Sequence, residues 1–212
     1  QYKFNRLHLH LTDAAGWRIE IKRYPRLTSL AAWREGKTWK EWSKLGCKYM
    51  HEGEEGAYGG YYTQDELRDL VKYAAERGIT IVPEIEMPGH SAEVLTAYPE
   101  LSCTHEPYKQ MDFCPGSVAT YDFLENVLKE VMDIFPSKYI HVGGDEADKA
   151  SWPSCPLCQQ KMKELGTDKD GLQAHLIAHF GKFLTDHGRQ LVGWDEVIAG
   201  NLAKNTTVML WR

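Results

Sequence analysis

Residues 138–146 read KYIHVGGDE, an apolar run that ends in two glycines and then in two adjacent carboxylates. The run predicts a buried strand over residues 138–143. The glycines allow the backbone to come close to a ligand where the strand ends. Acidic groups at the end of a strand are typical of a site at the carboxyl edge of a parallel sheet. Asp145 and Glu146 are therefore candidate functional residues; the alternative is a solvated pair at a helix start, where the helix dipole favours anions.

Four further segments have strand character, at residues 6–11, 79–85, 189–194 and 207–211. Apolar residues with helical spacing are predicted to form amphipathic helices between Thr63 and Gly78, between Leu124 and Ile134, and between Leu172 and Leu184. The first of these helices begins with a capping box, Thr63 and Glu66. Strands that alternate with helices predict a parallel sheet covered by helices.

Such a sheet can be an open doubly wound sheet or a (β/α)₈ barrel. The chain contains neither the GxGxxG fingerprint nor the P-loop that open nucleotide-binding sheets use. Instead, polar groups follow successive strands: His10 and Asp13; Glu84, Glu86 and His90; Asp145 and Glu146; Trp194, Asp195 and Glu196. This pattern favours the (β/α)₈ barrel.

A complete barrel needs about 250 residues and eight strands, whereas 212 residues provide five predicted strands. The predicted fold is thus an incomplete (β/α)₈ TIM barrel, one partial domain over residues 1–212. The chain starts at Gln1 without an initiator Met or a signal-type apolar segment, and predicted strands lie close to both ends. We therefore expect the protein to continue on both sides.

The composition is that of a globular chain, with 42% hydrophobic and 26% charged residues and a net charge of -5. No run approaches the roughly 18 uncharged apolar residues that cross a bilayer, so no membrane span is expected. Mild acidity without a basic stripe argues against a nucleic-acid partner. Seven tryptophans and many carboxylates suit an uncharged sugar ligand.

The five cysteines are an odd number and cannot all pair with one another. Cys103 and Cys114 flank a short polar loop and could form a disulfide in an oxidising compartment. Cys155 and Cys158 form a CxxC motif, which is found in half-sites for zinc and in redox pairs. A second CxxC or a nearby His pair is missing for the zinc interpretation, and the thioredoxin-like context is missing for the redox one. A local disulfide or free thiols is the interpretation that we favour.

Four motifs occur in order along nearly the whole chain: HLHLTD at 8–13, PEIEMPGH at 83–90, HVGGDE at 141–146 and GWDE at 193–196. Together they resemble the catalytic barrel of glycoside hydrolase family 20, the β-N-acetylhexosaminidases. The resemblance implies exo-acting removal of terminal N-acetylglucosamine or N-acetylgalactosamine by substrate-assisted retaining catalysis, an exception to the paired-carboxylate scheme. It also implies N-acetylhexosamine-containing glycans or chito-oligosaccharides as partners, and no metal or cofactor in the site.

The resemblance assigns roles to the matching residues. Glu146 would protonate the leaving oxygen and later deprotonate water. Asp145 would accept the N–H of the sugar's 2-acetamido group, whose oxygen attacks the anomeric carbon. Asp13 and His90 would support Glu146, and His10 lies beside them without an assigned role.

Aromatic residues would line the site. The resemblance places Trp194 and Trp211 around the acetamido methyl group, which aromatic faces bury well. Trp152, in the segment after Glu146, is a weaker candidate for the same wall. The family's remaining sugar-binding groups would lie on strands outside this chain.

Two other functions remain open. His8 and His10 share one face of a strand, as in metal-dependent amidohydrolases, although no later strand end supplies a further histidine. An inactive sugar-binding relative or fragment is the second alternative, against which the intact Asp145–Glu146 pair speaks. The expected setting is periplasmic, secreted or lysosomal; oligomeric state is not predicted.

Overall fold

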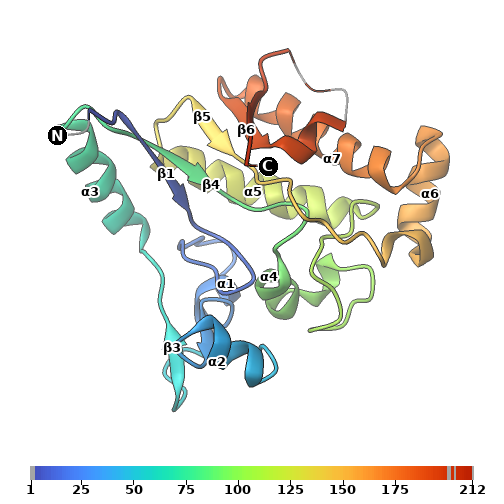
Figure 1. Ribbon diagram of the computed structural model, residues 1–212, viewed down its shortest axis with the longest axis horizontal. Coiled ribbons are helices and arrows are strands. Elements are labelled where there is room, and N and C mark those ends of the chain that lie inside the picture. The colour runs from blue at the N-terminus through green and yellow to red at the C-terminus, as the bar shows by residue number, and fades with distance from the viewer. Residues whose placement is uncertain (1–2, 200–201, 203, 212) are drawn as a thin grey trace.

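The computed structural model describes residues 3–199, 202 and 204–211, and its centre is one parallel sheet (Figure 1). Its five strands are hydrogen-bonded in the order β1-β4-β5-β6-β7, and every neighbouring pair is parallel. The strands are β1 (Arg6–His10), β4 (Thr80–Glu84), β5 (Tyr139–His141), β6 (Gln190–Trp194) and β7 (Thr207–Met209). All five predicted strands therefore occur. β5 is shorter than predicted, because Gly143 and Gly144 adopt positive φ angles of 67° and 98° and turn the backbone out of the sheet.

Three long helices flank the sheet (Figure 1). They are α3 (Gln64–Ala75), α5 (Val118–Ile134) and α7 (Lys169–Asp186), as the periodicity predicts. Their apolar stripes join the strands in the main core, where Leu67, Val127, Leu128, Leu176 and Phe180 are almost completely buried. At the start of α3, Thr63 Oγ1 accepts a hydrogen bond from the Glu66 amide at 3.2 Å, and Glu66 Oε2 accepts one from the Thr63 amide at 2.8 Å. This is the predicted capping box.

Smaller elements occupy the segments that follow the carboxyl ends of the strands. After β1 come a two-stranded antiparallel ribbon and two short helices; short helices also follow β4, β5 and β6 (Figure 1). They are α1 (Arg26–Ser29), β2 (Trp33–Glu35), α2 (Trp39–Lys44), β3 (Ala57–Gly59), α4 (Ala92–Ala97), η1 (Pro99–Leu101), η2 (Trp152–Ser154), α6 (Pro156–Leu165) and η3 (Asp195–Ala199). The edge of the sheet where these segments begin is the one at which the polar residues gather.

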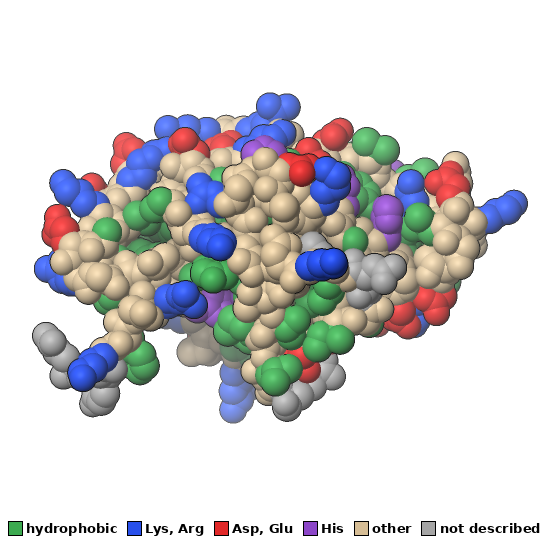
Figure 2. Space-filling model, turned by 90° about the horizontal axis from the view of Figure 1, so that it is seen from above, with side chains coloured by type: hydrophobic (Ala, Val, Ile, Leu, Met, Phe, Trp, Pro, Cys, Tyr) green, Lys and Arg blue, Asp and Glu red, His purple; other side chains and the backbone are tan. Residues whose placement is uncertain are grey.

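The surface in Figure 2 carries Lys and Arg side chains along its whole length, with Asp and Glu side chains among them. No helix in the described ranges is long and apolar enough to span a membrane.

Candidate active site

The strand register places three ionisable side chains in one row. His10 at the end of β1 is paired with Glu84 at the end of β4, and Glu84 is paired with His141 at the end of β5. Glu84 is completely buried. Its Oε2 lies 2.6 Å from His10 Nδ1, and its Oε1 lies 3.0 Å from His141 Nδ1 and accepts a hydrogen bond from Trp194 Nε1 at 2.9 Å. His8 Nε2 approaches Oε2 to 2.8 Å.

These neighbours decide the charge of Glu84. Burial alone would raise its pKa, but the hydrogen bond to His10 and the close contacts with His141 and His8 outweigh burial and hold the pKa far below its usual range. Conversely, hydrogen bonds to Asp13 and Glu84 raise the pKa of His10 to about 10. Glu84 is therefore an anion, and His10 is a cation beside it.

The row continues from His10 into the first loop. His10 Nε2 lies 3.2 Å from Asp13 Oδ2, and Asp13 Oδ1 lies 3.2 Å from His90 Nδ1. Hydrogen bonds to Asp13 and then to Asp145 raise the pKa of His90 to about 11. Burial opposes ionisation of Asp13, but hydrogen bonds from His10 and His90 lower its pKa well below the usual value. We call Glu84, His10, Asp13, His90 and Asp145 the carboxylate–histidine chain, in which negative and positive groups alternate.

The carboxylate–histidine chain ends at the predicted pair of acids, Asp145 and Glu146. His90 Nε2 lies 3.4 Å from both Asp145 Oδ2 and Glu146 Oε2. The two carboxylates differ in surroundings: the Asp145 side chain is 14% exposed and the Glu146 side chain 57% exposed. The buried oxygen Asp145 Oδ1 has no hydrogen-bond partner among the described residues. Asp145 can therefore accept a hydrogen bond from a ligand, while Glu146 can exchange protons with one.

A further carboxyl group, Glu86, lies beneath the pair. It is 3% exposed, and its Oε1 lies 3.9 Å from His10 Nδ1. Burial, together with the charges of Asp145 and Glu84, raises the pKa of Glu86 to about 10, so this carboxyl is protonated near neutrality. A Cβ atom at Gly143 would lie 1.8 Å from Glu86 Oε2, so only glycine at 143 leaves room for Glu86.

An open pocket of about 260 Å³ lies above these groups. It is lined by His10, Asp13, Glu86, His90, Asp145, Glu146, Trp194 and Trp211. The predicted acids, supporting residues and two of the three predicted tryptophans thus share one pocket. Trp194 is half-buried, and its indole N–H donates a hydrogen bond to Glu84. Trp211 donates its indole N–H to Glu196 Oε2 at 3.1 Å. Both rings leave apolar surface for a ligand.

Comparison with known proteins agrees with this geometry. The family model for the catalytic domain of glycosyl hydrolase family 20 matches residues 1–212. The chain belongs to this family.

Relatives in the family resemble the whole chain. It is 42% identical to a beta-hexosaminidase of Porphyromonas gingivalis, over 100% of the chain and 26% of the relative. It is 41% identical to the beta-hexosaminidase of Vibrio furnissii, over 99% of the chain and 35% of the relative. The chain therefore spans only about a quarter to a third of these relatives.

Solved family 20 structures match the fold. An exo beta-N-acetylglucosaminidase of Vibrio harveyi, in complex with N-acetylglucosamine, superposes with a TM-score of 0.84 at 36% identity, over 100% of this chain and 34% of that one. A beta-N-acetylhexosaminidase of Bacteroides fragilis gives 0.80 at 39% identity, over 98% and 39%. The predicted fold class, a (β/α)₈ barrel of which this chain holds five strands, is confirmed.

Trp152 requires a correction. It is fully buried in η2, where its indole N–H donates to the Phe113 carbonyl at 3.0 Å, and it packs with cysteines and Leu172. The segment after Glu146 turns away from the pocket before it reaches Trp152. A ring with no exposed surface cannot contact a substrate, so Trp152 is removed from the proposed pocket wall.

His10, a residue of the alternative amidohydrolase site, makes hydrogen bonds to carboxylates. Both ring nitrogens of His10 face carboxylates, Glu84 and Asp13. One oxygen of Glu84 is occupied by the donor-only indole of Trp194. These contacts favour a hydrogen-bond network around His10. The expectation that no later strand end supplies a histidine was wrong, because His141 is the last residue of β5 and lies beside His8 and Glu84. Neither His10 nor His141 has a role that the sequence predicts, although the HLH pattern at residues 8–10 directs both of its histidines toward one face.

Proposed function

We propose that residues 1–212 form the acid/base part of the catalytic barrel of an exo-acting β-N-acetylhexosaminidase. The enzyme hydrolyses terminal N-acetylglucosamine or N-acetylgalactosamine from glycans or chito-oligosaccharides. The observation that carries this proposal is the unequal pair in the pocket. Asp145 offers a buried, unpartnered acceptor oxygen, and Glu146 offers an exposed carboxyl next to it.

Substrate-assisted retention needs these two properties. The 2-acetamido oxygen attacks the anomeric carbon and forms an oxazolinium ion, while Glu146 protonates the leaving oxygen. Asp145 accepts the acetamido N–H and stabilises the positive charge as it grows; a fixed anion in that position acts most strongly on the transition state. Glu146 then takes a proton from the water that opens the ring. No enzyme nucleophile is required.

The remaining residues of the pocket orient this pair. His90, held protonated by Asp13, presents its Nε2–H between Asp145 and Glu146. The carboxylate–histidine chain ties His90 to the sheet through His10 and Glu84. Trp194 and Trp211 offer apolar faces for the acetamido methyl group.

The test is hydrolysis of p-nitrophenyl N-acetyl-β-glucosaminide by the full-length protein and its Glu146→Gln variant. We expect turnover that falls at least about 100-fold in the variant, as general acid catalysis requires. The matched control is Glu106→Gln, an exposed carboxylate outside the pocket. A second substrate, p-nitrophenyl β-glucoside, lacks the acetamido group and should not be turned over.

Other outcomes would separate the alternatives. Binding of N-acetylglucosamine without turnover would show an inactive sugar-binding relative. Equal turnover of both substrates would contradict assistance by the acetamido group. Glycan substrates place the enzyme in a periplasmic, secreted or lysosomal setting, which cell fractionation of the full-length protein can check.

A further inference from the structure

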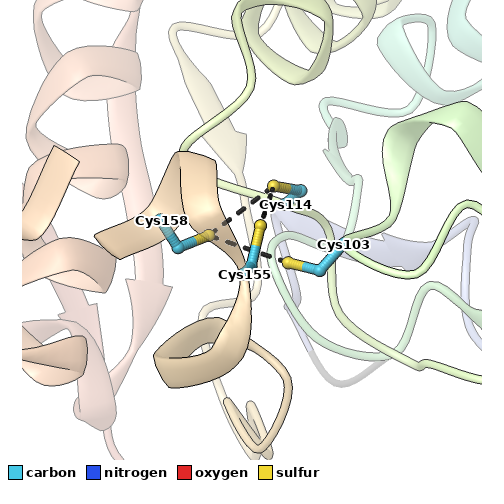
Figure 3. A group of neighbouring side chains, drawn as sticks. All are labelled: Cys103, Cys114, Cys155 and Cys158. Carbon is cyan, nitrogen blue, oxygen red and sulfur yellow. Dashed lines mark hydrogen bonds between the residues drawn. The ribbon is translucent and has the colours of Figure 1, made fainter. Parts of the chain in front are cut away.

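Four of the five cysteines converge from two regions that are far apart in the sequence, residues 103–114 and residues 155–158. Cys103 follows η1, Cys114 precedes α5, and Cys155 and Cys158 lie at the start of α6. Figure 3 shows their sulfurs pointing toward one another across the space between these segments. We call these four residues the cysteine cluster.

The spacing of the sulfurs is that of a tetrahedral metal site. Sγ of Cys158 lies 3.7 Å from that of Cys103 and 3.6 Å from that of Cys114, and Sγ of Cys114 lies 3.7 Å from that of Cys155. All four sulfurs lie within 4.8 Å of one another. A zinc ion with Zn–S bonds of about 2.3 Å places its sulfurs about 3.8 Å apart. Because Cys114 and Cys158 each contact two partners, the cluster does not divide into two separate pairs.

The surroundings form a closed site. Cys114 and Cys158 are fully buried, Cys155 is 5% exposed, and Trp152 and Leu172 pack around them. Gly116 allows the chain to pass close to α6, since a Cβ atom there would lie 2.3 Å from the Leu157 carbonyl carbon. Cys103 is only partly buried, but four protein ligands fill the tetrahedral positions, which is the mark of a structural zinc site.

We propose that Cys103, Cys114, Cys155 and Cys158 bind one structural Zn²⁺ as thiolates. Soft sulfur ligands in tetrahedral array select zinc over the harder divalent ions. Binding releases the thiol protons to solvent. The five cysteines form no disulfide. The proposed zinc site goes beyond the free thiols expected from the sequence, because Cys103 and Cys114 can supply the second pair of ligands that the CxxC motif lacked.

The zinc would tie together the loops that hold the catalytic pocket. Between Cys103 and Cys114, the Asp112 carboxylate accepts the amides of Asp148 at 3.3 Å and Lys149 at 2.7 Å, just after Glu146. The Phe113 amide donates to the Pro88 carbonyl at 2.9 Å, two residues before His90. The segment between the first two ligands thus lies against both loops that carry the proposed acid/base groups.

Metal analysis of the purified full-length protein tests this proposal independently of activity. After brief treatment with EDTA and gel filtration, we expect about one zinc per chain. The Cys155→Ser/Cys158→Ser double variant should retain less than a tenth of that zinc. Cys47→Ser, which changes the one cysteine outside the cluster, should keep all of it.

Alkylation in denaturant and chelator, without reductant, supplies the second readout. A zinc site predicts that all four cluster cysteines are modified. Two disulfides, seen as unmodified cluster cysteines without bound zinc, would overturn the proposal. Free thiols with no bound metal would also overturn it, and so would a site that holds iron instead of zinc. If the double variant does not fold, the zinc content of the wild type and of Cys47→Ser still decides whether the protein binds zinc.

Discussion

The carboxylate–histidine chain and the cysteine cluster both lie at or beyond the carboxyl ends of strands, but they are held in different ways. In the first, the register of β1 and β4 pairs His10 with Glu84, and the register of β5 places His141 on the other side of Glu84. In the second, the contacting cysteines are 41 to 55 residues apart and stand on loops and the first turn of a helix. The sheet orients the first group; a bound ion would have to orient the second. Substitutions in the carboxylate–histidine chain should therefore change the catalytic rate, and substitutions around the cysteine cluster should make the loops more mobile.

The largest expected effect is on the chemistry of the first region. Asp145→Asn removes the negative charge that faces the proposed oxazolinium ion while preserving the shape of the side chain. Loss of one such electrostatic group costs about 100- to 1000-fold in kcat. Steady-state kinetics with p-nitrophenyl N-acetyl-β-glucosaminide measures this loss, and the zinc content should stay unchanged.

The control is Asp148→Asn, the same chemical change three residues along the same segment. Asp148 is exposed and lies outside the pocket lining, so kcat should remain within about two-fold of wild type, as for surface substitutions of small energy. Equal losses in the two variants would show that kcat responds to the loop in general and not to the charge of Asp145.

The second prediction probes the link between the two regions. Asp112 is buried, and its carboxylate accepts two backbone amides of the segment after Glu146. Asp112→Ala leaves both N–H groups without an acceptor, at a cost of about 3 kcal/mol in the free energy of unfolding of this segment. Hydrogen exchange should show faster exchange at Asp148 and Lys149.

Asp112→Asn sharpens this test, because its amide keeps one acceptor oxygen. It should lose about half as much protection as the alanine variant. Protection that is unchanged in both variants would mean that the cysteine-bearing loop does not restrain the segment that carries Glu146.

The third prediction concerns pH. The pKa of Glu86 is raised to about 10 by burial and by the charges of Asp145 and Glu84, while His90 and His10 oppose the shift; an unfolded glutamate titrates near 4.3. The folded chain thus binds more protons between these values. The contribution to stability is complete below about pH 4.3 and is lost as pH rises toward 10.

Glu86→Gln keeps the shape of the side chain but does not titrate. Between pH 6 and pH 8, the wild type should lose about 3 kcal/mol more unfolding free energy than this variant. Urea denaturation at the two pH values measures the difference, with Glu106→Gln as the exposed control. An identical loss in wild type and Glu86→Gln would contradict the protonated state of Glu86.

The two regions also differ in how far the sequence predicts them. The strands and three long helices follow from periodicity, and the acids at strand ends follow from parallel strands meeting at one edge. Asp145 and Glu146 were found in this way, Asp13 and His90 were assigned through the family motifs, and the pocket brings the four together. Trp194 and Trp211 were predicted through the family motifs, and they line the same pocket.

The positions of side chains in loops were harder to predict from the sequence. Trp152 was placed in the pocket because it follows Glu146, but the direction of the intervening segment depends on tertiary contacts such as those of Asp112. The cysteine pairs 103/114 and 155/158 each look local in the sequence. Nothing in their spacing shows that two loops bring them together, and only the folded chain does.

The smallest expected effect lies outside both regions, in the capping box of α3. Thr63→Ala removes the acceptor of the Glu66 amide, which costs about 1 kcal/mol of stability. Thr63→Ser retains the hydroxyl and should restore most of it. Neither variant should alter kcat or zinc content, because Thr63 belongs to neither cluster, and thermal unfolding measures the small loss of stability. A fall in kcat in Thr63→Ala would mean that helix packing, and not the sheet register, positions the pocket. The carboxylate–histidine chain and the cysteine cluster would then no longer differ in how they are held.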